Sequence, residues 1–190
     1  MKEGVFLQKH EAVMNDMRFS LQQVERAKPI ISELLKGGEI KAVEGTDEEI
    51  CLMLDRTCGI DYFQVYNNTG LVWGIGSRFQ KVWSKPFNTF TVRRSRQSGA
   101  DTEYKKRQFA IKHNGTYPQL TMQGYYHSTT GEILSLAIAK TVDLMEYIEK
   151  NQNNIPVQYT HEDKIGQASF FVVDWSLFQN AGYKLLMWER

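Results

Sequence analysis

Apolar positions change their spacing along the chain, from a helical period to a strand period and back. Over residues 15–38 they recur three and four positions apart, which predicts a helix that ends at Gly37 and Gly38 and is kinked or divided by Pro29. Residues 46–58 predict a second helix, because Thr46 and Glu49 form a capping box and Gly59 follows as a terminator.

From residue 60 the apolar period shortens to two. The runs 60–66 and 71–79 are joined by the turn sequence NNTG and predict a β-hairpin, and residues 89–95 predict a third strand. A helix over 98–115, capped near Ser98 or Asp101, and a strand over 117–127 follow. Downstream we expect a strand over 133–141, a short helix capped by Thr141, a loop or edge strand over 151–167, and a strand over 169–175.

This order of elements predicts an α/β (α+β) domain built on one mixed β-sheet. We expect a single domain over residues 1–190, with an N-terminal helical extension at 1–45, a core of order αβββαβ at 46–127, and further strands and helices at 128–190 that complete it. A hydrophobic content of 42% is ample for the core of one domain.

Composition excludes several classes of protein. There is neither an apolar run of the roughly 20 residues that a membrane helix needs nor a secretion signal, so we expect no membrane partner and a cytoplasmic location. Cys51 and Cys58 lie seven apart on one predicted helix, which favours reduced thiols. The four histidines are scattered, so any metal would be held by oxygen ligands.

Basic residues are concentrated in one segment. Residues 78–107 contain nine basic side chains and two acidic ones, a local balance of +7 in a chain of net charge +1. Aromatic residues are interleaved with them, as is typical of a surface that contacts a phosphate backbone. A solvated basic face is the alternative interpretation. The nucleic-acid contacts that we expect are Arg93, Arg94, Arg96, Lys105 and Arg107.

The order helix, three strands, helix, strand over residues 46–127 resembles the core of the PD-(D/E)XK nuclease superfamily, which includes restriction enzymes and Holliday-junction resolvases. In that superfamily, an acidic residue at the start of one strand and an (E/Q)xK pair on the next bind Mg²⁺ beside the scissile phosphate. Asp61 in GID resembles the first of these, and SRFQ, ending in Gln80, stands at the second. Oxygen ligands suit Mg²⁺, which can deprotonate a bound water.

The second motif departs from the family pattern, because Arg78 stands where a carboxylate is expected. The resemblance implies that the missing carboxylate has moved to Glu103 on the following helix, with Lys106 nearby, and that Glu49 is a further metal ligand. Each residue also has a structural explanation. Asp61 would open a strand, Glu49 would complete the capping box, and Glu103 would pair with Lys106 or Arg107 along the helix.

Three functions follow. The first is a Mg²⁺- or Mn²⁺-dependent DNA endonuclease with catalytic residues Asp61, Gln80, Glu103, Lys106 and Arg78 and metal ligands Asp61, Glu103 and Glu49. Nucleases of the fold it resembles often work as homodimers, but the sequence does not define the oligomeric state. The second keeps the fold and binds nucleic acid without cleavage, because a cation at a ligand position repels Mg²⁺. The third is a bacterial or phage accessory or defence-related protein that meets a partner protein through Trp83, Phe87, Trp175 and Trp188.

Overall fold

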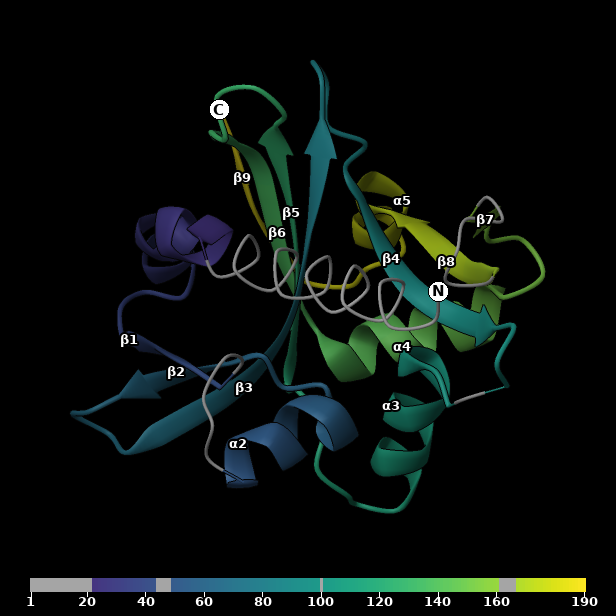
Figure 1. Ribbon diagram of the computed structural model, residues 1–190, viewed down its shortest axis with the longest axis horizontal. Helices are drawn as coiled ribbons and strands as arrows, with labels where there is room; N and C mark the ends of the chain where they lie inside the picture. Colours follow the sequence, from purple (N-terminus) through teal and green to yellow (C-terminus); the bar gives the residue numbers. More distant parts are fainter. Residues whose placement is uncertain (1–21, 44–48, 100, 161–166) are drawn as a thin grey trace, which may run out of the picture.

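The computed structural model describes residues 22–43, 49–99, 101–160 and 167–190, which form two β-sheets and the helices that cover them (Figure 1). Residues 22–34 are helical. The other helices are α2 (Glu49–Met53), the π-helical turn η1 (Leu54–Cys58), α3 (Glu103–Lys112), α4 (Thr141–Asn151) and α5 (Trp175–Asn180). The strands are β1 (Glu39–Ala42), β2 (Tyr62–Tyr66), β3 (Leu71–Val82), β4 (Thr89–Arg96), β5 (Leu120–His127), β6 (Ile133–Lys140), β7 (Val157–Tyr159), β8 (Ala168–Asp174) and β9 (Leu185–Glu189).

The larger sheet has six strands in the order β1-β2-β3-β5-β6-β9, and the smaller has three in the order β4-β8-β7. In the larger sheet β3 and β5 run parallel and the other neighbours are antiparallel. The predicted α+β class with a mixed sheet is therefore confirmed, whereas one sheet alone was expected. The difference arises because β5, and not β4, pairs with the free edge of β3. Strand β4 pairs with β8 in a second sheet, with Thr89 opposite Asp174.

The larger sheet is covered on both faces. The helix at 22–34 packs Val24, Ala27 and Ile31 on one face, in a cluster that includes Leu136 and Ile138 of β6. Their neighbours in β6 turn to the opposite face, because side chains alternate along a strand. There a second cluster joins the sheet to β4, β8, α4 and α5, and its largest members are Trp175, Tyr125, Phe90 and Phe178. Figure 1 shows the helix at 22–34 and the smaller sheet on opposite sides of the larger sheet.

The predicted hairpin is present, with Tyr62 of β2 opposite Ile75 of β3 and Gly70 in the turn at φ 66°. Its two strands differ in length, since β2 has 5 residues and β3 has 12. Beyond β2, β3 continues as the partner of β5 from Ile75 to Val82. The central strand of the sheet therefore extends well past the end of the hairpin.

Several local predictions differ from the structure. The helix at 22–34 continues through Pro29, and Thr46 lies outside the described residues, so its capping box with Glu49 stays a prediction. Helix α3 has Thr102 as its N-cap residue and not Ser98 or Asp101, the two expected caps, and Gly59 ends η1 at φ 69° as predicted. Strands β1 and β9 were not predicted. None of the helices in the described ranges has the length and hydropathy that crossing a bilayer requires.

Candidate functional site

A polar cavity of about 360 Å³ opens between η1, the β2–β3 hairpin, β4 and the first turn of α3. We call it the arginine cavity. Six basic and four acidic side chains line it, together with Cys58, Gly59 and Ser77. The charged residues are Arg56, Arg78, Arg93, Arg96, Lys106 and Arg107, and Asp55, Asp61, Asp101 and Glu103.

Glu103 is the acidic centre of the cavity, and both of its carboxylate oxygens accept hydrogen bonds. Oε1 is 2.8 Å from Nη1 of Arg107, and Oε2 is 3.0 Å from Nη2 of Arg78. The backbone N–H of Arg93 also donates to Oε2, at 3.2 Å. Glu103 stands in the first turn of α3, where the helix dipole favours a negative charge. One carboxylate thus holds two guanidinium groups in place.

Arg107 is buried, with 4% of its surface exposed, and forms the inner wall of the cavity. Its Nη1 also donates to Oγ1 of Thr121, at 3.1 Å, and that hydroxyl lies 2.9 Å from the hydroxyl of Thr141. Space for the guanidinium depends on Gly76 of β3, because a Cβ atom there would lie 2.5 Å from Nη2 of Arg107. The expected contact of Arg107 with a nucleic-acid backbone stays a prediction, and it requires a phosphate to enter the cavity because Arg107 is buried.

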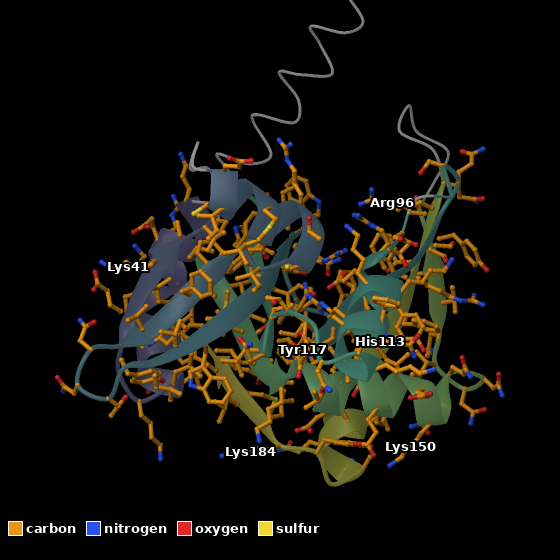
Figure 2. All side chains as sticks on the ribbon, turned by 90° about the horizontal axis from the view of Figure 1, so that it is seen from below. Lys41, Arg96, His113, Tyr117, Lys150 and Lys184 are labelled. Atoms are coloured by element: carbon orange, nitrogen blue, oxygen red, sulfur yellow. The ribbon has the colours of Figure 1, made fainter. Side chains whose placement is uncertain are left out.

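Arg78 and Arg93 share an aromatic support. Their guanidinium carbons lie 5.0 and 5.4 Å from the ring centroid of Phe170 in β8. Arg94 instead lies over Phe171, on the other face of the smaller sheet, and does not line the cavity. Adjacent side chains of a strand point to opposite faces, so only one of these two arginines can line the cavity. Arg96 is exposed, and Figure 2 shows it on the side of β4 that faces residues 49–58.

The remaining carboxylates differ in their surroundings. Oδ2 of Asp61 accepts a hydrogen bond from the backbone N–H of Ser77. Burial raises the pKa of the Asp55 carboxyl above its ordinary value, and the nearby charges of Arg56 and Lys106 offset only part of that effect. Lys106 Nζ donates to the carbonyl oxygen of Arg56, at 2.8 Å, and so connects α3 to η1 across the mouth of the cavity.

The structure brings together seven of the predicted site residues and leaves four outside. The predicted residues that line the cavity are Asp61, Arg78, Arg93, Arg96, Glu103, Lys106 and Arg107. Those that lie outside it are Glu49, Gln80, Arg94 and Lys105. Gln80 was expected beside Asp61 at one end of the hairpin. Because Tyr62 pairs with Ile75, Asp61 lies next to Gly76 and Ser77, and Gln80 is aligned with Tyr125 of β5 farther along.

The sequence prediction missed Asp55, Arg56 and Asp101 as cavity residues. A usable signal was the position of Asp55 and Arg56 in the last turn before Gly59, which returns the chain directly to Asp61. Because connections of this kind are short, the last turn of η1 lies close to Asp61.

Within the described ranges, no three His, Cys, Asp or Glu side chains are grouped so as to hold a metal ion. Neither the protein-family models nor the curated proteins contain a match to the chain.

Proposed function

We propose that the protein binds the phosphate backbone of a nucleic acid in the arginine cavity. The observation that carries the proposal is the pairing of Glu103 with Arg78 and Arg107, which neutralises the central carboxylate from within the protein. Arg93 and Arg96 then face the cavity without an acidic partner in any described salt bridge. Guanidinium groups present a rigid fork of donors that matches phosphate geometry.

The charge of the surrounding segment supports the same ligand. Between Asp61 and Asp101 the sequence contains no acidic residue, and six basic residues fall in that interval: Arg78, Lys81, Lys85, Arg93, Arg94 and Arg96. The strands β3 and β4, which this interval forms, supply one wall of the cavity. A polyanion approaching this wall meets no Asp or Glu side chain from either strand, so its local association is favoured electrostatically.

Cleavage of the bound strand is the second candidate function, favoured by the presence of Asp61 and Glu103 in one cavity. The carboxylate oxygens in the cavity, as they are arranged, do not form a site that fits Mg²⁺. Both oxygens of Glu103 accept from N–H groups, and the Arg78 guanidinium at 3.0 Å would repel a divalent cation. A Mg²⁺- or Mn²⁺-dependent activity would require Arg78 to leave Glu103.

Fluorescence anisotropy with labelled single-stranded and duplex DNA over a range of salt concentrations tests the binding proposal. Arg96→Ala should lower the affinity roughly three- to tenfold and reduce the salt slope by about one phosphate. Lys41→Ala, on the far side of the molecule in Figure 2, removes the same charge and should change neither. Equal effects of the two variants, or no binding by the parent at low salt, would overturn the proposal.

Glu103→Gln separates the two candidate functions. If the cavity binds phosphate, loss of the central negative charge should strengthen DNA binding roughly three- to tenfold, since it frees Arg78. If the cavity binds a metal, Mg²⁺ or Mn²⁺ should raise the melting temperature of the parent, and both Glu103→Gln and Asp61→Asn should abolish that rise. Metal-dependent cleavage of DNA by the parent would establish the second candidate.

A further inference from the structure

The connection between β3 and β4, residues 83–88, presents two aromatic rings to solvent. We call it the aromatic loop. Trp83 is 76% exposed and Phe87 is 68% exposed, the two highest values among the large hydrophobic residues that the structure describes. Exposed rings of this size, close together in the chain, mark a binding surface more often than chance. Trp175 and Trp188, the other two aromatic residues of the predicted partner surface, are instead buried and half-buried.

The two ends of the aromatic loop are fixed to the core. At its start the carbonyl oxygen of Val82 accepts from the N–H of Ser128 at 2.8 Å, and at its end the carbonyl oxygen of Asn88 accepts from the N–H of Trp175 at 3.0 Å. The Asn88 side chain also accepts a hydrogen bond from the hydroxyl of Ser135, at 2.9 Å. The rings are therefore held outward on an anchored backbone, which lowers the entropy lost when a ligand binds them.

Phe87 has a defined orientation. Its ring meets Tyr125 edge to face, with centroids 6.0 Å apart, so that one edge is supported while most of the ring stays exposed. Figure 1 shows the connection from β3 to β4 projecting at the top of the view, away from α3 and α4. A planar ligand can reach the rings there without displacing another part of the described chain.

The charges around the rings select the ligand. Exposed Lys81 and Lys85 flank Trp83 along the chain, and the sequence has no acidic residue between Asp61 and Asp101. At the far end of the loop, Nδ2 of Asn88 donates a hydrogen bond to Oε1 of Glu189. Exposed aromatic rings between basic side chains suit nucleobases whose phosphates lie alongside. In a duplex the flat faces of the bases are covered by their neighbours, so stacking on these rings requires unpaired bases.

We propose that the aromatic loop is a base-stacking platform and that the ligand of this protein is single-stranded nucleic acid. The inference rests on the proposed function, since the same strand would place its phosphates in the arginine cavity. Trp83 follows Arg78 by five residues along β3, a separation of roughly 17 Å at about 3.4 Å per residue. That length corresponds to about five stacked nucleotides at the 3.4 Å spacing of one strand.

The test compares three ligands: a single-stranded oligonucleotide of roughly ten residues, the same strand with abasic sites, which has the same number of phosphates, and the same strand paired in a duplex. Trp83→Ala with Phe87→Ala should weaken binding of the normal single strand roughly ten- to hundredfold and leave the abasic strand unaffected. Tyr159→Ala, which removes another exposed ring from β7, is the matched control and should change nothing. Trp83→Phe should retain most of the affinity.

Arg96→Ala distinguishes failure of this inference from failure of the proposed function. If Arg96→Ala weakens all three ligands while the double loop variant binds each of them like the parent, the arginine cavity binds the backbone and the stacking platform is wrong. If the parent binds none of the ligands, both proposals are wrong. If the parent instead forms an oligomer that the loop variant dissociates, without any effect on oligonucleotides, the rings meet a second copy of the chain and the platform is again wrong.

Discussion

Glu103→Gln should destabilise the protein, because it removes the counter-charge of a buried guanidinium. The Arg107 side chain is 5% exposed and that of Glu103 20%, with 2.8 Å between the paired atoms. Removing one partner of a fully buried ion pair costs about 3–5 kcal/mol. Glu103 keeps some contact with water and the glutamine oxygen still accepts one hydrogen bond, so we expect a loss of about 2–3 kcal/mol.

Urea denaturation followed by circular dichroism measures this loss. The midpoint should fall while the slope with denaturant is unchanged, since the variant leaves the fold intact. For a chain of this size, the loss corresponds to a fall in melting temperature of roughly 5–10 °C. Arg107→Met in the same background should recover part of the stability, because it removes the uncompensated charge.

A loss below about 1 kcal/mol would refute the reasoning, since Arg107 would then be solvated or neutralised by another group. The same variant is expected to bind DNA more tightly, so stability and affinity should move in opposite directions. A variant that lost both would indicate that Glu103 contacts the ligand directly.

Three further changes test the cavity and the helix at 22–34. Gly76→Ala should destabilise the protein by about 1–3 kcal/mol, because the new Cβ would lie 2.5 Å from Arg107; a neutral result in urea denaturation would show that the wall of the cavity can shift. Pro29→Ala should raise the free energy of unfolding by about 1–3 kcal/mol, since it restores the backbone donor that proline lacks inside the helix at 22–34, and an unchanged midpoint would contradict this. Asp55→Asn should raise the melting temperature at pH 7, because burial raises the pKa of Asp55 and so makes its ionised form unfavourable in the folded state. The advantage of the variant should shrink as the pH falls through the raised pKa and vanish below the ordinary pKa of an aspartate; an advantage that persists in acid would exclude this cause.

Local patterns in the sequence predicted the local elements. The hairpin turn, the end of η1 at Gly59 and helix α3 follow from turn residues, a left-handed glycine and helical spacing, all of which act within a few positions. Helical spacing left Lys106 and Arg107 as alternative ion-pair partners of Glu103, and in the structure the partner on α3 is Arg107.

Those local patterns could not predict which strands pair when they lie far apart in the sequence. The partner of β4 is β8, which begins 72 positions after the end of β4, and no local signal specifies that pairing. Gln80 lies away from Asp61 because β3 extends past the end of β2. The length of that extension depends on the pairing of β3 with β5, which local sequence patterns do not specify. The burial of Arg107 depends on a glycine in another strand, so its spacing on α3 could not distinguish a surface cation from a buried one.

Among the pairings of the described strands, β3 with β5 is the one parallel pair, and the connection between them contains β4 and α3. This connection supplies several lining residues of the cavity, among them Arg93, Arg96 and Glu103. They reach η1 only after β5 has paired with β3. Closing a long connection is an entropic cost that comes before its contacts form. A ligand that spans the cavity therefore stabilises the closed sheet as a whole, and hydrogen exchange should slow in β5 as well as in the residues it touches.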